Sequence, residues 1–267
     1  CLGEGHQCHR RHPAVKLIRV ALATLLAATT VSCSSAPATP STATAPASRT
    51  ITVLAAASLT EPVNALAKTF EQAHPGSTVR VSYGSSTTLV QQVVQGAPAD
   101  LIALAGTDAV AQLPTAMTAT HPPITFAENA LEIATPANNP AQVSGLVDLA
   151  RPDVKVVLCV GTAPCGKAAD TALASAGVTA HIVSREIDAK ATLAKLRLGE
   201  ADAGLIYHSD VVAAAGAVTG IPLPSRYAVS VTYALVQLTD NPGVAELAQA
   251  LTDATAKAAY RAAGFGQ

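Results

Sequence analysis

The fold class is set by one stretch near position 50, Ile51-Thr-Val-Leu-Ala-Ala-Ala-Ser-Leu-Thr60. Its first five residues are apolar or β-branched, which is typical of a buried strand. An amphipathic helix is predicted to follow from Leu59 to His74, where Pro75-Gly76 stops it. A buried strand that runs directly into a helix is the first half of a βαβ unit, so this stretch predicts an α/β fold.

The alternation of strands and helices continues outward from this stretch. Further strands are predicted at 79–83, 100–104, 130–134, 154–158 and 203–207, and a strand-rich stretch covers 227–237. Helices are predicted at 88–95, 166–176, 188–198 and 242–262, the last with Asn241 as its cap and Pro242 in its first turn. This order predicts parallel sheets flanked by helices, with ligand sites beyond the carboxyl ends of the strands.

The first 33 residues have the layout of a secretory signal peptide. Lys16 and Arg19 precede an apolar run at 20–31, which is too short to span a bilayer comfortably. The run ends in Thr30-Val-Ser-Cys33, which resembles a bacterial lipobox, the motif whose cysteine becomes the lipidated first residue. An ordinary secretory peptide with an incidental cysteine is the alternative. The segment therefore predicts export, with a lipid anchor at Cys33.

Two segments around this signal are expected to lie outside the folded protein. Residues 1–14 precede the signal, and a non-ATG start at Val15 would leave them untranslated. Residues 34–49 are rich in Pro, Ser, Thr and Ala without periodicity, so we expect a flexible tether there. The folded region is expected to begin at Thr50.

The net charge is −1 and is unevenly distributed along the chain. Residues 1–49 contain five Lys and Arg and one acid, so residues 50–267 contain the remaining twelve basic and seventeen acidic side chains, a formal charge of −5. Nucleic-acid binding depends on clustered Lys and Arg, so this charge argues against that function. If the folded region binds an anion, it must do so with local dipoles.

Two strand-to-helix junctions carry hydroxyl groups. At the first, Ser58 is followed three positions later by Glu61, and the simplest interpretation is a capping box. The second, Gly84-Ser-Ser-Thr-Thr88, has four consecutive hydroxyls, more than one helix cap needs. A helix start offers unpaired N–H groups and a partial positive charge, and hydroxyls add donors without adding a titratable group. Two such junctions predict an uncharged cradle for an oxyanion.

These junctions, together with three further blocks, resemble the periplasmic molybdate-binding proteins of ABC transporters. The resemblance covers residues 50–266 in order and spacing. It is carried by Ile51 to Thr60, Gly84-Ser-Ser-Thr-Thr-Leu89, Gln95-Gly-Ala-Pro-Ala-Asp-Leu101, Ala203-Gly-Leu-Ile-Tyr-His-Ser-Asp210 and the closing Tyr260 to Phe265. It implies a two-lobed periplasmic-binding-protein fold of the second type, with parallel or mixed sheets flanked by helices and the ligand in the interlobe cleft.

The resemblance also implies the limits of the lobes and the residues of the site. Lobe I is expected at 50–129 and 228–267 and lobe II at 130–227, with crossovers near 128–130 and 226–228. The anion would be held by hydroxyls of lobe I and by backbone N–H groups and one hydroxyl of lobe II. These residues are Ser58 and Ser86 in lobe I, and Cys165 and Ala189, both through N–H, with Tyr207 in lobe II.

Cys159 and Cys165 bracket a short loop and allow four interpretations: a disulfide, a metal pair, a reactive thiol near a histidine, or two buried free thiols. The exported location favours the disulfide. The spacing matches no zinc signature. The histidines beyond the signal are scattered singly and are interpreted as surface or structural residues rather than ligands: His74, His121, His181 and His208.

The leading functional hypothesis is a non-enzymatic, monomeric solute-binding component of an ABC importer. It would capture molybdate, and tungstate of nearly the same size, deliver it to the permease subunits and need no cofactor. The alternatives are a binder of sulfate, phosphate or a small organic anion, and an exported hydrolase. No Gly-x-Ser-x-Gly or Ser-x-x-Lys motif supports a hydrolase. Phosphate binding would gain from an Asp that accepts the ligand's proton, and neither hydroxyl junction has one, although Asp188 lies beside Ala189.

Overall fold

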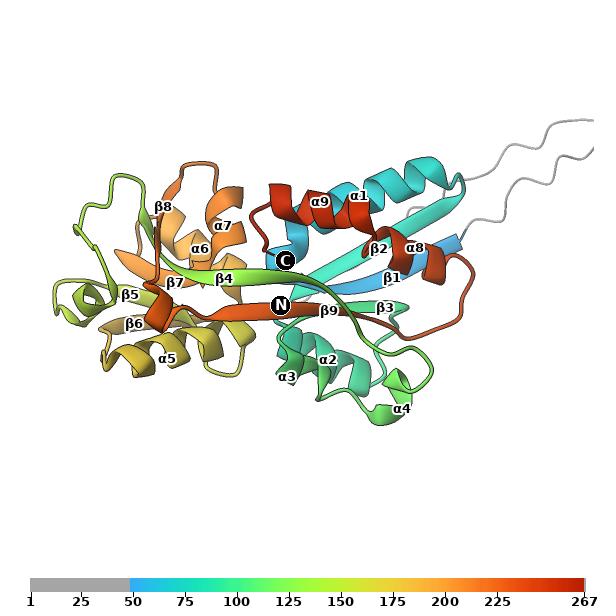
Figure 1. Cartoon of the computed structure of the whole chain (residues 1–267), viewed down its shortest axis with the longest axis horizontal. Helices are drawn as coiled ribbons and strands as arrows, with labels where there is room; N and C mark the ends of the chain where they lie inside the picture. The colour runs from blue at the N-terminus through green and yellow to red at the C-terminus, as the bar shows by residue number, and fades with distance from the viewer. Residues whose placement is uncertain (1–48, 267) are drawn as a thin grey trace, which may run out of the picture. The chain divides into compact units, whose positions relative to one another are not determined.

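The computed structural model describes residues 49–266, which alternate between strands and helices as the sequence predicts (Figure 1). The predicted signal peptide with Cys33 and nearly all of the predicted tether lie outside the described residues. The strands are β1 (Arg49–Ala56), β2 (Ser77–Gly84), β3 (Leu101–Ala105), β4 (Ile124–Pro136), β5 (Val156–Cys159), β6 (Ile182–Glu186), β7 (Ala203–Tyr207), β8 (Val218–Pro222) and β9 (Ser230–Gln237).

The helices lie between these strands and after β9. The α-helices are α1 (Thr60–Ala73), α2 (Ser86–Val94), α3 (Thr107–Val110), α4 (Thr115–Thr118), α5 (Pro164–Ala176), α6 (Ala189–Arg197), α7 (His208–Ala213), α8 (Val244–Ala250) and α9 (Ala254–Ala262). The 3₁₀ helices are η1 (Ala57–Leu59), η2 (Leu146–Ala150) and η3 (Ser225–Tyr227). Among the described residues, no helix is long and apolar enough to cross a membrane.

The strands pair in the order β2-β1-β3-β9-β4-β7-β5-β6, and β8 pairs with β4. The pairs at both ends of this order are parallel, namely β1 with β2 and β3, and β5 with β6 and β7. The pairs in the middle are antiparallel and involve β4 and β9. The sheet is therefore mixed, and parallel strands lie on both sides of an antiparallel centre.

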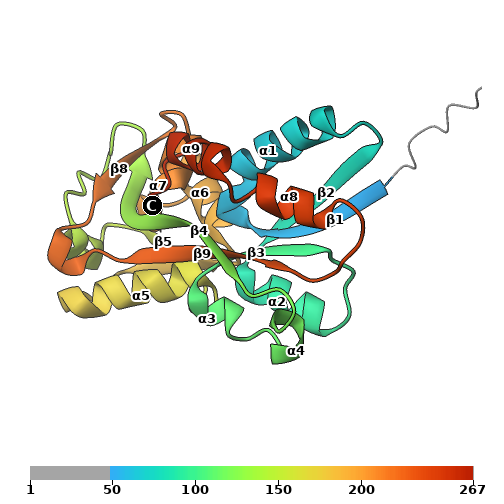
Figure 2. The same ribbon diagram turned by 45° about the vertical axis from the view of Figure 1, so that its right-hand side comes forward.

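Strands β4 and β9 run side by side through the middle of this sheet and connect its two parts (Figures 1 and 2). β4 pairs with β9 as far as Ala130 and with β7 from Leu131 onward. Below, lobe I means β1–β3 with α1–α4, α8 and α9, and lobe II means β5–β8 with α5–α7. The ends of the parallel strands in both lobes lead into helices that face the junction between the lobes.

Aliphatic side chains fill the space between sheet and helices, as the low aromatic content requires. In lobe I, Val90 and Val93 of α2 pack against Leu54 of β1 and Ile102 of β3. In lobe II, the α6 residues Leu193 and Leu196 pack in the same way against β5 and β7. Burying one such side chain contributes roughly 1.5–3 kcal/mol, and this packing fixes where each helix begins relative to its strand.

Three sequence predictions about element limits are wrong. Arg49, expected to end the tether, begins β1 and pairs with Ser77. Helix α2 begins at Ser86 rather than at 88, so the hydroxyl residues form its first turn. The helix predicted over 242–262 is divided into α8 and α9, because the Asp253 side chain accepts a hydrogen bond from the Ala256 N–H and starts a new helix.

Asn241, predicted to cap that last helix, has a different role. Its side-chain amide donates to Asp100 Oδ1 at 2.7 Å, and Gly243, with φ of 85°, precedes α8 instead. The positive φ is one that glycine adopts without strain. The amide therefore ties the end of β9 to the start of β3 rather than to a helix.

Candidate functional site

The five residues that the sequence proposes as ligands all line one pocket between the lobes. Lobe I contributes Ser58 and Ser86, and lobe II contributes Cys165, Ala189 and Tyr207. The rest of the lining is small or uncharged apart from one carboxylate: Ala56, Ala57, Gly84, Ser85, Ala105, Pro164 and Asp188. The structure thus brings together positions that are up to 149 residues apart in the sequence.

Ser58 lies in η1, directly after the buried strand β1, and it is not a helix cap. Its Oγ is 2.7 Å from the hydroxyl of Tyr233 in β9, and either oxygen can donate. Helix α1 has no side-chain cap, so the capping box with Glu61 is wrong. The 3₁₀ turn moves the helix start past Ser58, and this leaves the serine facing the pocket. When Tyr233 donates to Ser58, the Ser58 O–H is available to a ligand.

Ser86 is the first residue of α2 and is almost completely buried. Its Oγ accepts a hydrogen bond of 2.8 Å from the backbone N–H of Ala105, at the end of β3. A hydroxyl has one hydrogen to donate, and this bond leaves that hydrogen unused. The contact with Ala105 therefore holds Ser86 as a donor at the edge of the pocket.

Cys165 lies in the first turn of α5 and is joined by a disulfide to Cys159, the last residue of β5. The loop between them packs closely on the helix, because a Cβ at Gly166 would lie 2.0 Å from the Val160 carbonyl oxygen. Glycine is the residue that permits this approach. The N–H of Cys165 is in the first turn of the helix, where no acceptor exists one turn earlier. The strand, the disulfide and the glycine together fix this N–H at the pocket.

Ala189 is the first residue of α6, and Asp188 before it is the helix cap. Asp188 Oδ1 accepts from the Ala191 N–H at 2.9 Å, which satisfies one of the free donors of the first turn. The Ala189 N–H lies ahead of this bond and has no intrahelical acceptor. A backbone donor is thus exposed to the pocket at a position where the side chain is only a methyl group.

Tyr207 ends β7 and contributes a buried hydroxyl to the pocket. Its hydroxyl is buried and has no hydrogen-bond partner among the described residues. Burial raises the pKa of the phenol well above its ordinary value, and the nearby Tyr233 and Asp210 add to this effect. The Tyr233 ring packs edge-on against the Tyr207 ring at 6.3 Å. Tyr207 is therefore a fixed, protonated donor that lacks an acceptor.

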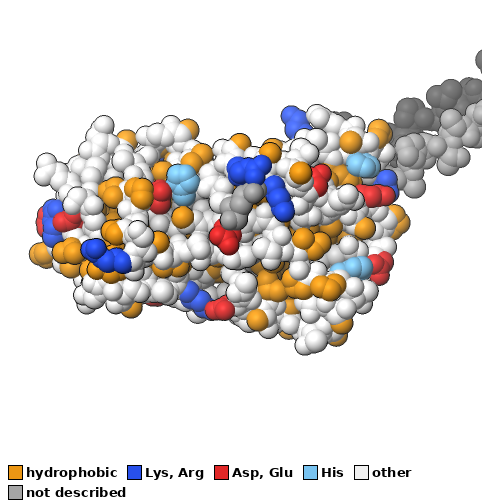
Figure 3. All heavy atoms as spheres, in the orientation of Figure 1, with side chains coloured by type: hydrophobic (Ala, Val, Ile, Leu, Met, Phe, Trp, Pro, Cys, Tyr) orange, Lys and Arg blue, Asp and Glu red, His pale blue; other side chains and the backbone are white. Residues whose placement is uncertain are grey.

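Uncharged dipoles dominate the electrostatics of this pocket. The first residues of η1, α2, α5 and α6 all contribute to the lining or adjoin it, and a helix start carries roughly half a positive charge. None of the lining residues is Lys, Arg or His. On the face shown in Figure 3, most charged side chains lie apart from one another, and a few Lys or Arg side chains lie together near its middle. The arrangement can hold a compact anion by hydrogen bonds from several directions.

Neither of the two predicted ligand serines has a general base beside its hydroxyl in this structure. The partner of the Ser58 hydroxyl is a tyrosine, and that of the Ser86 hydroxyl is a backbone amide. A serine nucleophile needs an adjacent general base, and neither contact supplies one. Residues 49–266 contain no cluster of His, Cys, Asp or Glu that could hold a metal ion. Each histidine predicted to be structural instead contacts a neighbouring group. These contacts are His74 with Phe70 O, His121 with Asp240, His181 with Val154 O and His208 with Glu132.

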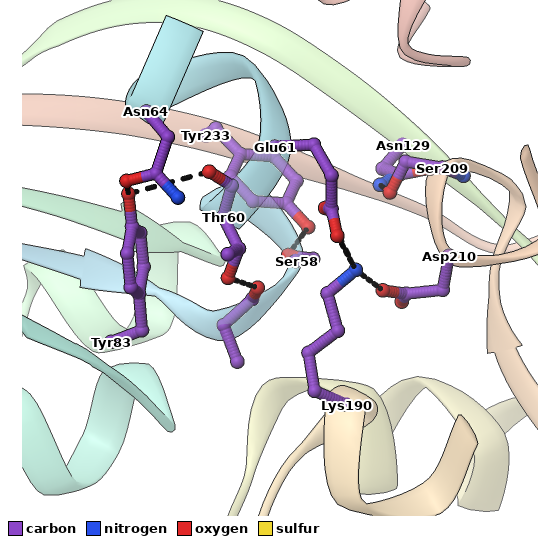
Figure 4. Close-up of polar contacts among 11 residues, drawn as sticks. Ser58, Thr60, Glu61, Asn64, Tyr83, Asn129, Lys190, Ser209, Asp210 and Tyr233 are labelled. Atoms are coloured by element: carbon purple, nitrogen blue, oxygen red, sulfur yellow. Dashed lines mark hydrogen bonds and ion pairs between the residues drawn. The ribbon is translucent and has the colours of Figure 1, made fainter. Parts of the chain in front are cut away.

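Sequence reasoning missed several residues that support the site. Tyr233 orders Ser58, and Lys190 lies between Glu61 of lobe I and Asp210 of lobe II (Figure 4). Asn129 in β4 donates to Ser209 Oγ at 2.7 Å and joins β4 to α7. Tyr233 and Ser58 are 175 positions apart, so no local pattern indicates their contact.

Comparison with known proteins identifies the family of this chain. A family profile described as bacterial extracellular solute-binding protein matches residues 51–266. The molybdate-binding protein ModA of Mycobacterium tuberculosis is 35% identical, and the alignment covers 87% of this chain and 90% of that protein.

Two solved structures share the fold. The Azotobacter vinelandii periplasmic molybdate-binding protein has a TM-score of 0.69 at 19% identity, with 81% of this chain and 99% of that chain covered. The Mycobacterium tuberculosis sulfate-binding protein SubI has a TM-score of 0.71 at 18% identity, with 81% and 86% covered. At these identities the structures establish the periplasmic-binding-protein fold alone. The family match over nearly the whole described region shows that this chain belongs to the bacterial extracellular solute-binding proteins.

Proposed function

We propose that this protein captures molybdate, and equally tungstate, and delivers it to an ABC importer. The observation that carries the proposal is the pocket itself: donors from two lobes meet there, and none of them is a cation. A small tetrahedral oxyanion presents acceptors in four directions, which suits donors that converge from both sides. The protein acts in this proposal by binding alone.

The donor set favours a fully ionised anion. The hydroxyls of Ser86 and Tyr207 and the N–H groups of Cys165 and Ala189 are donors, and an unprotonated dianion offers only acceptors. Asp188 is the one carboxylate in the lining, and its Oδ1 is occupied by the Ala191 N–H. A carboxylate engaged in a helix cap is poorly placed to accept a proton from hydrogen phosphate. Molybdate, which is unprotonated at neutral pH, fits this set better than phosphate does.

Sulfate is the second candidate, since it is also an unprotonated tetrahedral dianion. The sulfate-binding SubI shares the fold at 18% identity. The relative at 35% identity, however, is a molybdate-binding protein that matches over 90% of its length. This relative supports molybdate ahead of sulfate. Molybdate and tungstate are nearly equal in size, so the same pocket suits both.

A ligand screen tests the proposal. Thermal unfolding is measured with molybdate, tungstate, sulfate or phosphate, because a ligand at about 100 times its Kd stabilises the folded state by roughly 2.7 kcal/mol. Molybdate and tungstate are expected to raise the Tm at concentrations where sulfate and phosphate have little effect. Ser86→Ala is expected to remove most of the shift, and Ser82→Ala, an exposed serine in β2, to leave it unchanged. A larger shift with sulfate than with molybdate would make sulfate the ligand.

We also propose that the protein is exported and held at the membrane by a lipid on Cys33, where a monomer docks on the permease subunits. Support comes from the lipobox-like Thr30-Val-Ser-Cys33, the Pro- and Ser-rich segment that follows, and the family of extracellular proteins to which the chain belongs. Cys33→Ala is expected to move the protein from the membrane fraction to the soluble extracytoplasmic fraction. A native protein that is already soluble there would contradict the lipid anchor.

A further inference from the structure

The predicted ligand residues of the pocket are buried in this structure. Ser58, Ser86, Cys165, Ala189 and Tyr207 are each at most 4% exposed. A solvated anion cannot reach donors that are buried to this degree. The lobes must therefore separate to admit the ligand and come together again around it, and contacts that join the lobes determine how firmly the closed state is held.

One charged contact between the lobes is much closer than the others. Lys190 Nζ in α6 lies 2.8 Å from both carboxylate oxygens of Glu61 in α1 (Figure 4). The same nitrogen lies 3.2 Å from Asp210 Oδ1 in α7. The ammonium thus donates hydrogen bonds to the two carboxylate oxygens of lobe I and forms an ion pair, without a hydrogen bond, with one carboxylate oxygen of lobe II.

The position of this contact ties it to the site. Lys190 directly follows Ala189, whose N–H faces the pocket, and Glu61 is three residues after Ser58. The ion pair therefore connects the two backbone segments that present donors from opposite lobes. Lys190 does not itself line the pocket.

The two carboxylates that contact Lys190 differ in their surroundings. Asp210 is completely buried and belongs to the same lobe as Lys190, so this pair persists when the lobes separate. The Glu61 side chain is 49% exposed and belongs to the other lobe, so its pair with Lys190 forms only on closure. Asp210 holds the ammonium in place, and Glu61 is the group that engages it.

We propose that Glu61, Lys190 and Asp210 form an interlobe latch, in which Lys190 is a positioning residue that closes the lobes around the bound anion. The inference rests on the proposed function, because it assigns the latch to the same pocket. Among the described residues, two other polar side-chain contacts join lobe I to lobe II: Thr87 Oγ1 donates to Thr162 O at 2.8 Å, and Lys167 pairs with Asp108 at 3.7 Å. The first is uncharged and the second is long and exposed, so the interlobe latch is the main charged restraint.

The Glu61→Gln substitution distinguishes the latch from simple charge repulsion, because the two predict opposite changes in molybdate affinity. Glu61 places a negative charge beside a site for a dianion, so charge repulsion alone would make its neutralisation strengthen molybdate binding. Loss of the latch instead weakens binding. We expect molybdate affinity to fall roughly five- to tenfold, mainly through faster dissociation, since the ion pair across the closed lobes is lost and the glutamine amide keeps at most one acceptor for the Lys190 ammonium.

Two controls make this measurement specific. Glu200→Gln removes an exposed ion pair with Lys195 inside lobe II, and it is expected to leave molybdate affinity unchanged. Lys190→Met combined with Glu61→Gln is expected to weaken binding no more than Lys190→Met alone, since both changes break one contact. Lys190→Met leaves Asp210 buried without its cation and can fail to fold, in which case Glu61→Gln alone decides.

Small-angle X-ray scattering of the chain without ligand adds a readout that needs no binding. Glu61→Gln is expected to give a larger radius of gyration than the unaltered protein, and Glu200→Gln the same one. Unchanged or tighter molybdate binding by the Glu61→Gln variant would overturn the latch. It would not overturn the proposed function, which the Ser86→Ala variant tests separately. If the unaltered protein binds no molybdate, the proposed function fails, and an unchanged radius of gyration for Glu61→Gln would then overturn the latch independently.

Discussion

Tyr207 ends β7 with a hydroxyl that is buried and unpartnered among the described residues. A buried donor without an acceptor costs roughly 1–3 kcal/mol in the unliganded protein. The edge-on contact with the Tyr233 ring keeps the phenol in place despite this cost. A ligand oxygen that accepts from Tyr207 removes the cost, so this residue lowers stability when the pocket is unliganded and contributes to affinity when it is filled.

Tyr207→Phe is therefore expected to have opposite effects on stability and on binding. The unliganded Tm should stay the same or rise slightly, because the unpartnered hydroxyl is gone and the ring remains. Molybdate affinity should fall roughly ten- to a hundredfold, since a hydrogen bond to a charged acceptor contributes about 1.5–3 kcal/mol. Calorimetric titration and thermal unfolding check both effects. An unaltered affinity would show that the Tyr207 hydroxyl does not contact the anion.

Asp210 makes the stability of the folded protein depend on pH, and the direction of this dependence follows from its pKa. Burial raises the pKa of its carboxyl group from 3.8 to about 6, Lys190 opposes this effect, and Glu61 adds to it. The folded state therefore binds this proton more tightly than the unfolded state does. The resulting stability is fully present below about pH 4 and is lost as the pH rises to about 6. The difference in pKa corresponds to about 3 kcal/mol.

Asp210→Asn removes this titration. The free energy of unfolding of the unaltered protein, measured relative to the Asp210→Asn variant, is expected to decrease between about pH 4 and 6 and to level off above. Urea denaturation at a series of pH values measures it. A difference that does not vary with pH would contradict the assignment of the pKa to Asp210.

At the level of elements, the starts of the helices determine the pocket, and most of them could be predicted from the sequence. The strand before Ser58 and the hydroxyl run at Ser86 are local patterns, and the structure has a helix start at each. The prediction of a capping box is wrong because each side chain of the Ser-x-x-Glu pattern has a distant partner instead. Ser58 contacts Tyr233, and Glu61 contacts Lys190. The break between α8 and α9 is not predicted, because an aspartate such as Asp253 within a predicted helix does not by itself indicate a new helix start.

The disulfide at the start of α5 provides a test at this scale. Cys159 and Cys165 join the end of β5 to the first turn of α5 and restrain the loop that presents the Cys165 N–H. Reduction is expected to weaken molybdate binding severalfold, while the short closed loop limits the loss of stability to roughly 2 kcal/mol. Calorimetric titration with and without reductant measures this effect.

The doubly substituted Cys159→Ser, Cys165→Ser protein is the matched control, because reductant should leave its binding unchanged. Mass measurement of the unreduced, alkylated protein gives a further check on the bond itself. Peptides that carry alkylated Cys159 and Cys165 would show two free thiols and rule the disulfide out.

For the whole molecule, the main difficulty is holding a dianion in a folded region whose formal charge is −4, since Arg49 of β1 adds one positive charge to the −5 of residues 50–267. The structure points to a solution in which helix starts and hydroxyls from both lobes surround the ligand, while Lys190 is engaged by carboxylates outside the pocket lining. The family resemblance predicted the fold and the positions that meet in the pocket. The contact between Lys190 and Glu61 spans 129 positions and follows from tertiary packing, which no local pattern encodes.

The most direct test of this account is a crystal structure with tungstate, located by its anomalous scattering. We expect one strong peak between the lobes, with the hydroxyls of Ser58, Ser86 and Tyr207 and the N–H groups of Cys165 and Ala189 within hydrogen-bond distance of its oxygens. No Lys or Arg nitrogen should contact the anion, and Lys190 should remain paired with Glu61. A peak elsewhere, or Lys190 or Lys167 in direct contact with the tungstate oxygens, would contradict the uncharged site.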